Sequence, residues 1–224
     1  MLSFHRHEEC SALTGLAMKS FDATFIGRRR MLRKKSEIDL SPPYDKIYRI
    51  ESGNLVLTTS DSSGVEVPLR RLAQGEFFGE FCFCPEGNEP HEYVAARALE
   101  PSCLTEFRAA TFVRSIQTDS HVLRDFIGSV CRQLASAERR IFALSHRAAQ
   151  QRLCLVLLEL SARGSESTKV LLGHSEIADF AAMSRSHVSV TLSRLRQMGF
   201  ISYRRQGPIV VHTARVRRFL DQNL

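Results

Sequence analysis

The feature that most constrains the fold is an apolar stripe in the second half of the chain, whose members follow one another in alternating steps of four and three. The stripe consists of Leu123, Ile127, Val130, Leu134, Ala137, Ile141 and Leu144. This spacing is the a/d seam of a left-handed coiled coil, and it continues through three heptads. A seam of this kind requires a partner helix, so we expect a parallel homodimer. The alternative is packing against the chain's own β domain, a contact that Phe126 and Phe142 could make from outside the seam.

Upstream of the seam, the chain consists of short β-rich runs. KIYRI, NLVLTT and VEVPLRRL, all between residues 44 and 108, are separated by the turn sequences SG, DSSG and QG. Short strands with frequent turns predict an antiparallel β-roll or barrel. The basic cluster RRRMLRKK at 28–35 precedes this region, and we interpret it as a solvated face.

Downstream of the seam, the sequence predicts a helical unit. A break near 145–147 is followed by an amphipathic helix over 148–164 that ends at Gly164, and then by a loop, SESTK. Two short helices come next, with Ser175 and Ser184 as their predicted N-caps. Gly199 is predicted to end the second of them in a left-handed conformation.

Only three residues, 182–184, join these two short helices. So short a joint makes the helices cross steeply, which is the geometry of a helix-turn-helix. The segment FISYRRQGPIVVH at 200–212 alternates around a Gln-Gly-Pro turn, as a two-stranded wing does. We therefore predict an α+β chain in three parts: a β-roll sensor domain over 1–108, a dimerisation helix and hinge over 109–146, and a winged helix-turn-helix over 147–224.

The formal net charge of +7 lies entirely in the third part. Residues 147–224 hold twelve Lys and Arg against five Asp and Glu, and eleven of the twelve are Arg. Arginine is well suited to forked contacts with phosphates and guanine edges. The asymmetry therefore predicts a polyanionic partner, namely double-stranded DNA.

The second short helix lies within SRSHVSVTLSRLRQMG at 184–199 and has a thin apolar stripe. We predict that Val188, Leu192 and Leu195 anchor this helix, so that its polar face enters a major groove. The predicted DNA-binding residues are Lys169, Ser175, Arg185, Ser186, His187, Ser189, Val190, Arg194 and Arg196.

These residues are expected to divide between bases and backbone. Arg185 is expected to make a bidentate contact with guanine. The two serines at 186 and 189 are expected to contact base edges or phosphates, and Val190 a thymine methyl group. His187, Arg194 and Arg196 are expected to hold the DNA backbone, and Lys169 to bind all sequences about equally.

Composition and residue patterns exclude several other classes of protein. No apolar run approaches the roughly 18 residues that a membrane span needs, and the polar start MLSFHRHEEC lacks the hydrophobic region of a signal peptide. We therefore expect a cytoplasmic protein without a membrane partner. The six cysteines show no paired CxxC spacing, so reduced thiols are expected. Residues 44–108 contain no His-x-His pair with a Glu, as a cupin-type enzyme requires, so we expect neither a catalytic nor a metal site.

The order of β-roll, long helix and winged helix-turn-helix resembles the cyclic AMP receptor protein and FNR family of bacterial transcription regulators. The resemblance covers roughly residues 40–222. It rests on YRIESGNLVLTTSDSSGVEVPLRRLAQGEFFGE at 48–80 and HSEIADFAAMSRSHVSVTLSRLRQMGFI at 174–201. It implies a cyclic-nucleotide-binding-like jelly roll, and a homodimer that binds a two-fold DNA site and recruits or blocks RNA polymerase.

The resemblance also implies an effector pocket at Gly79, Glu80, Pro90, His91 and Arg97. In relatives that bind cyclic AMP, the glutamate holds the ribose and a later Arg-Ser pair clamps the phosphate. This chain has Pro90 and His91 at that pair, and proline has no side-chain donor, so a buried phosphate would lack its countercharge. Arg97, on another strand, is the alternative phosphate partner. We therefore expect that cyclic AMP does not control this protein.

The cysteines and histidines bear on two cofactors that occur in this family, an iron-sulfur cluster and haem. FNR-like oxygen sensors hold an iron-sulfur cluster with several N-terminal cysteines, whereas this chain has only Cys10 there, so that cluster is not expected. The thiols of Cys82 and Cys84 would suit a redox switch if they lay on a strand, and would diverge on a helix. Haem stays open as a cofactor, with candidate ligands His5, His7, Cys10, Cys82, Cys84 and His91.

Two functions follow from these observations. The leading one is a dimeric, sequence-specific transcription regulator. The alternative is a haem-, redox- or small-molecule-sensing protein that acts mainly through protein partners. Many relatives carry Glu at Ser186 and Arg at Val190, so the preferred half-site is expected to differ from TGTGA and TTGAT.

Overall fold

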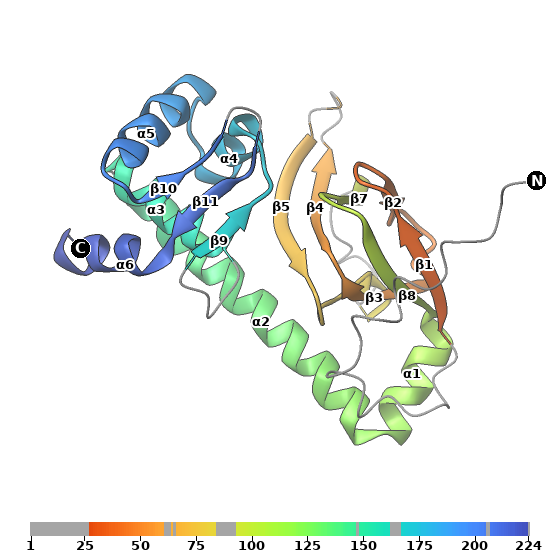
Figure 1. Ribbon diagram of the computed structural model, residues 1–224. Helices are drawn as coiled ribbons and strands as arrows, with labels where there is room; N and C mark the ends of the chain where they lie inside the picture. The colour runs from red at the N-terminus through yellow and green to blue at the C-terminus, as the bar shows by residue number, and fades with distance from the viewer. Residues whose placement is uncertain are drawn as a thin grey trace, which may run out of the picture.

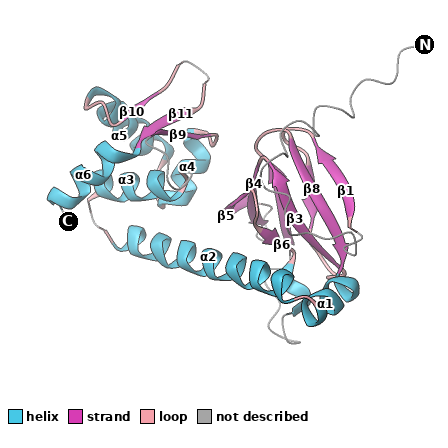
Figure 2. Cartoon of the chain, turned by 60° about the horizontal axis from the view of Figure 1, so that its bottom comes forward, coloured by secondary structure: helices cyan, strands magenta, loops and turns pink. Residues whose placement is uncertain are grey.

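The computed structural model describes residues 27–60, 64, 66–83, 93–146, 148–161, 167–204 and 207–223. An N-terminal β-roll and a C-terminal helical unit are joined by one long helix, α2 (Figures 1 and 2). The predicted α+β fold class, with a β-roll, a long helix and a winged helix-turn-helix in that order, is confirmed. No helix among the described residues is long and apolar enough to cross a membrane.

The β-roll is built from two four-stranded antiparallel sheets, with strand orders β1-β8-β3-β6 and β2-β7-β4-β5. Its strands are β1 (Arg28–Leu32), β2 (Glu37–Asp39), β3 (Lys46–Ser52), β4 (Asn54–Ser60), β5 (Glu66–Ala73), β6 (Phe77–Phe78), β7 (Tyr93–Ala98) and β8 (Ser102–Arg108). Side chains alternate across each sheet. Leu55 and Leu57 of β4 therefore fill the roll, whereas Val56 between them packs on the C-terminal unit.

After the roll, Asp119 separates two helices, α1 (Ala109–Thr118) and α2 (Ser120–Ser145), and one of its carboxylate oxygens caps α2 by accepting from the backbone N–H of His121 at 2.8 Å. An aromatic cluster that includes Phe77, Phe112 and Phe126 packs both helices against the roll. Polar contacts reinforce this packing, since the backbone N–H of Phe77 donates to Ser129 Oγ at 2.9 Å. One side of α2 is thus fixed to its own roll.

The C-terminal unit contains four helices and a three-stranded sheet of order β10-β11-β9 within its described residues. Its elements are α3 (Ala149–Glu159), β9 (Ser167–Val170), α4 (His174–Ala181), α5 (Arg185–Gln197), β10 (Ile201–Ser202), β11 (Ile209–His212) and α6 (Thr213–Asn223). Apolar residues from all of these helices share one core, which includes Leu153, Ile177, Leu192 and Leu220.

Three local predictions for this unit are wrong. The helix α3 ends at Glu159, because the chain turns at Leu160 and bends at Ser161, and the predicted end at Gly164 lies outside the described residues. Residues 167–169 of the expected loop form part of β9, which pairs with β11 and gives the wing sheet a third strand. Ser175 does not cap α4, since the helix begins at His174 after Gly173.

The joint of the helix-turn-helix keeps a left-handed residue although the chain has no glycine there. Ala182 ends α4 with φ 48° and ψ 52°, and Gly199 ends α5 with φ 73°, as predicted for the glycine. A left-handed conformation costs a residue with a Cβ atom roughly 1–2 kcal/mol. The joint between α4 and α5 therefore contains a strained alanine, which lowers the stability of the protein.

Replacing Ala182 with glycine is expected to raise the free energy of unfolding by about 1 kcal/mol, because glycine adopts this conformation without strain. The matched control is Ala178→Gly in the middle of α4, which is expected to lower the stability by about 1 kcal/mol or more, because a helix interior disfavours glycine. Chemical denaturation of both variants tests this. A loss of stability in Ala182→Gly as large as that of the control would contradict it.

Candidate nucleic-acid interface and effector pocket

The helix α5 is fixed to the C-terminal unit by its cap and its apolar stripe. Ser184 caps it as predicted, with Oγ accepting from the backbone N–H of His187 at 3.2 Å. Val188, Leu192 and Leu195 are fully buried, which confirms them as anchors. The opposite face of α5 is left to solvent.

That exposed face carries most of the residues predicted to bind DNA. The exposed members on α5 are Arg185, Ser186, His187, Val190, Arg194 and Arg196. Val190 is 61% exposed, which places a large apolar side chain in the open on an otherwise polar surface. A helix presented in this way matches the width of a major groove, where arginine, hydroxyl and methyl groups can meet base edges.

Three residues of the predicted set have side-chain partners within the protein, and the first is Ser186, whose Oγ lies 3.1 Å from Oγ of Ser184. Ser189 is half-buried, and its Oγ lies 3.0 Å from Nδ1 of His174. The guanidinium of Arg196 lies over the ring of Tyr203, 5.0 Å from its centroid. Neither of the last two contacts was predicted, because His174 and Tyr203 are separated from their partners along the sequence.

The remaining two predicted residues lie elsewhere on the unit. Ser175 is exposed in the first turn of α4. Lys169 is exposed on β9 and lines a small cleft together with Asn54 and Arg71 of the β-roll. The structure therefore does not bring Lys169 to the α5 surface, because β9 lies on the side of the unit that meets the roll.

The expected role of Arg97 in an effector pocket is corrected by its position. Ala96 and Ala98, its neighbours on β7, are buried in the roll, so Arg97 projects from the outer face. Its guanidinium donates to Glu176 of α4 at 2.6 Å and also lies near Glu66 and Glu37. Burial lowers the pKa of Arg97, but the hydrogen bond and charge of Glu176, with Glu66, outweigh burial and raise it. Arg97 thus links the roll to the helix-turn-helix.

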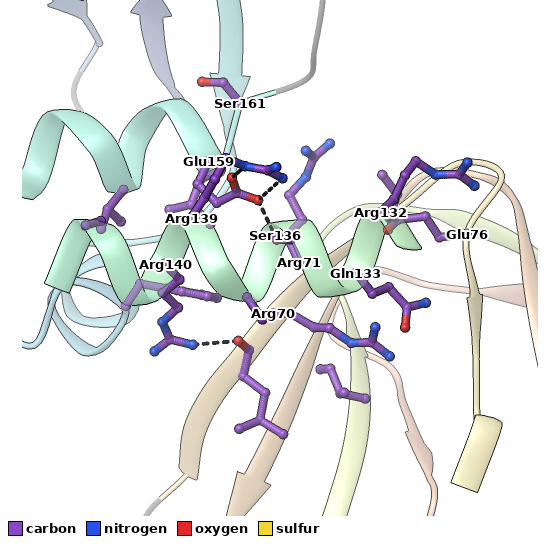
Figure 3. Close-up of a pocket in the computed structure, with 18 of the residues that line it drawn as sticks. Arg70, Arg71, Glu76, Arg132, Gln133, Ser136, Arg139, Arg140, Glu159 and Ser161 are labelled. Carbon is purple, nitrogen blue, oxygen red and sulfur yellow. Dashed lines mark hydrogen bonds and ion pairs between the residues drawn. The ribbon is translucent and has the colours of Figure 1, made fainter. Parts of the chain in front are cut away.

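A cavity of about 500 Å³ lies between β5, α2, α3 and α4 (Figure 3). Five arginines line it, which are Arg70, Arg71, Arg132, Arg139 and Arg140. The acidic side chains in its wall are Glu76, Glu80 and Glu159. The excess of cations over carboxylates makes this cavity suited to an anionic molecule.

Several of these arginines are already held by the protein. Arg70 donates to Glu80 at 2.6 Å, and Arg139 pairs with Glu159. Arg140 donates to the backbone carbonyl of Pro68 at 3.0 Å and lies over the ring of Phe180, 4.7 Å from its centroid. Burial lowers the pKa of Arg140. Arg140 therefore links α2 to the roll and to α4, whereas Arg139 is exposed while it pairs with Glu159.

The other predicted effector residues divide between described and undescribed parts of the chain. Gly79 has φ 84°, and a Cβ there would lie 2.7 Å from the Lys46 carbonyl oxygen, so its role is in the backbone turn that leads Glu80 to the cavity. Pro90 and His91 lie outside the described residues, as do the candidate haem ligands His5, His7, Cys10 and Cys84. Cys82 belongs to a short 3₁₀ helix at Glu80–Phe83 rather than to a strand, so the strand on which the redox switch depended is not present at Cys82.

Among the described thiols, burial raises the pKa of Cys154 to about 12, and Cys103 is also buried, whereas Cys131 is exposed. A raised pKa disfavours the reactive thiolate. The described residues bring no three His, Cys, Asp or Glu side chains together as a group that could hold a metal ion.

The apolar seam of α2 is exposed in the single chain. Leu123, Ile127, Val130, Leu134 and Ile141 are between 37% and 69% exposed, whereas Phe126 faces the roll and is 9% exposed. Phe142 is 53% exposed, so it does not make the contact with the roll that was considered for it. Exposed apolar patches of this kind mark interaction sites.

The exposed face of α5, its steep joint to α4 and the wing sheet define a DNA-binding protein of the winged helix-turn-helix class, with a β-roll as its second domain. Residues 42–119 match the cyclic nucleotide-binding domain, and residues 151–217 match the Crp-like helix-turn-helix domain.

Known proteins show the same arrangement over most of the chain. The cAMP-activated global transcriptional regulator Vfr of Pseudomonas aeruginosa is 24% identical over 192 residues, covering 83% of this chain and 90% of Vfr. The transcriptional regulator SdrP of Thermus thermophilus is 29% identical over 164 residues, covering 71% of this chain and 76% of SdrP. The structure of FixK2 from Bradyrhizobium japonicum superposes with a TM-score of 0.69 at 20% identity, covering 87% of this chain and 97% of the FixK2 chain. The chain belongs to the CRP/FNR family of DNA-binding transcription regulators.

Proposed function

We propose that this protein is a homodimeric transcription regulator that binds a two-fold DNA site through two copies of α5. The observation that carries the proposal is that one chain exposes both the apolar seam of α2 and the polar face of α5. The seam supplies the contact between copies, and α5 supplies the contact with the groove. RNA polymerase is the proposed protein partner, and a cytoplasmic location follows from the DNA partner of a bacterial type of regulator.

In this dimer, the hinge after α2 sets the spacing between the two α5 helices. α2 ends at Ser145 and α3 begins at Ala149, so few residues separate the seam from the DNA-binding unit. Successive major grooves on one face of a duplex lie about 34 Å apart, so a small change of hinge angle decides whether both helices dock. Arg97 of the roll contacts Glu176, and Arg140 of α2 contacts Phe180, so both contacts hold α4 and bias that angle.

We also propose that cyclic AMP is not the effector. The residues at the cavity do not fit the family's usual way of holding it. Glu80 is already paired with Arg70, and Arg97 projects from the outer face of the roll toward Glu176, away from the cavity. Proline at position 90 offers no donor to a phosphate. Titration with cyclic AMP is expected to leave DNA affinity and melting temperature unchanged, and a rise in either would contradict this proposal.

A small anionic molecule is the effector that the cavity favours. Its arginines come from β5 and α2, and α3 and α4 of the DNA-binding unit complete its wall. A ligand bound there would contact both units at once. This observation supports the small-molecule-sensing alternative as a regulatory layer on a DNA-binding protein.

Selection of bound duplexes from a random library tests the proposed function. We expect one two-fold sequence, bound by two chains with nanomolar-range affinity that falls steeply with salt, because arginine contacts release counterions from the phosphates. Recovery of no preferred sequence, or binding that is insensitive to salt, would overturn it.

A further inference from the structure

The side chain of His174 lies where it can control a hydroxyl on the DNA-reading helix. His174 is the first residue of α4, and its Nδ1 lies 3.0 Å from Ser189 Oγ, fifteen residues further along the chain. Ser189 lies one helical turn after Arg185, on the same side of α5. The contact therefore joins the first helix of the helix-turn-helix directly to a side chain of the second that was predicted to meet base edges or phosphates.

The imidazole of His174 is held in place from a second side. Its ring packs edge-on against the ring of Tyr203, with centroids 6.2 Å apart, and the Arg196 guanidinium lies on the same tyrosine ring. Tyr203 follows β10 at the base of the wing. His174 thus lies between α5 and the wing, with its partly buried nitrogen directed at Ser189.

A serine hydroxyl has one hydrogen to donate and lone pairs that accept. If Nδ1 of His174 accepts that hydrogen, Ser189 can only accept from the DNA, and it fits the amino groups of cytosine or adenine. If Nδ1 carries a hydrogen and donates it, the Ser189 hydrogen is free to point outward, and it fits the acceptors of guanine or thymine. A histidine that accepts therefore leaves Ser189 able only to accept from DNA, whereas a histidine that donates leaves Ser189 its own hydrogen and a further lone pair, so that it can do both, as a free serine can.

We propose that Nδ1 of His174 accepts the Ser189 hydrogen, so that His174 is a positioning residue that fixes the hydrogen-bonding direction of Ser189 and sets base preference at one position of each half-site. This inference rests on the proposed function, because it requires α5 to read bases. His174 itself need not touch DNA. Its effect on recognition passes through the hydroxyl of Ser189.

The experiment measures wild-type protein on its selected duplex and on every single-base variant of that duplex. The variants are His174→Ala, Ser189→Ala and the double variant, with His174→Asn as the conservative replacement, since an amide retains a polar atom near the position of Nδ1. We expect His174→Ala and Ser189→Ala to flatten preference at the same base position by about five-fold or more. The double variant is expected to add nothing, because the two residues act as one unit. His174→Asn is expected to restore part of the preference.

Other outcomes separate this inference from the function on which it rests. An equal loss of affinity for all bases in His174→Ala, or independent multiplication of the two single effects, would overturn the role of His174 while leaving DNA recognition intact. A wild-type protein with no base preference at any position would overturn the proposed function as well. Preference at the base read by Arg185 is the internal control, since it is expected to be unchanged in all four variants.

Discussion

Replacing both Ile127 and Leu134 with aspartate is expected to convert the protein to a monomer and to abolish tight DNA binding in the same step. Both residues occupy the seam of α2 and are at least half exposed in the single chain. Burying an aliphatic side chain contributes roughly 1.5–3 kcal/mol, and each copy of the dimer would lose two. The introduced carboxylates would also have to be desolvated next to their counterparts in the other copy. Light scattering gives the mass, and a DNA titration gives the affinity.

The matched control for this pair is Ala135→Asp, which introduces the same charge on α2 outside the seam. This variant is expected to remain dimeric and to bind DNA within a few-fold of the wild type. The aspartates at positions 127 and 134 do not touch the buried side of α2, where Phe126 and Ser129 pack on the roll. The monomeric double variant is therefore expected to keep its helix content and a cooperative thermal unfolding transition. A double variant that stays dimeric with its affinity intact would contradict the assignment of the seam.

Substitution of Arg185 by alanine is expected to remove discrimination at one base position of each half-site. A forked contact between arginine and guanine contributes roughly 1–3 kcal/mol to discrimination, which corresponds to roughly 5- to 150-fold at that position. Arg185 is exposed at the start of α5, where side chains of a docked helix reach base edges. Affinities for the four duplexes that carry each base at that position measure the loss.

Arg194→Ala provides the comparison, because it removes the same side chain from the same helix farther from its start. This variant is expected to weaken binding to all sequences about equally and to reduce the steepness of the salt dependence, as the loss of a phosphate contact does. Retained discrimination in Arg185→Ala together with altered base preference in Arg194→Ala would show that the two roles are exchanged.

Local patterns in the sequence were sufficient for the helices that matter most. The helical conformation of the α2 segment, the Ser184 cap, the anchors of α5 and the stop at Gly199 all depend on residues within a few turns of one another, and the structure forms them as the spacing indicates. The wing was predicted with two strands. Its third strand, β9, was missed because Ser167, Thr168 and Lys169 are polar, and only pairing with β11 makes them extended.

The contacts between the two units could not be predicted in the same way. Arg97 and Glu176 are 79 residues apart, and nothing near either of them indicates the other. Arginine on a helix is usually exposed, so nothing in the sequence indicated that Arg140 would be held by other parts of the protein. Its carbonyl partners on β5 and the ring of Phe180 become neighbours only when the roll, α2 and α4 assemble. The cationic cavity has the same origin, since elements of the roll, α2 and the C-terminal unit all contribute to its walls.

The most direct test of the central claim, that two copies present paired α5 helices to one duplex, is affinity as a function of half-site spacing. Duplexes carry two copies of the selected half-site whose centres differ in separation by single base pairs. We expect two chains per duplex and tight binding at a separation of about one helical turn, roughly 10 base pairs, with a steep loss when the separation changes by half a turn. Equal affinity for a lone half-site and for every spacing, with one chain per duplex, would contradict it.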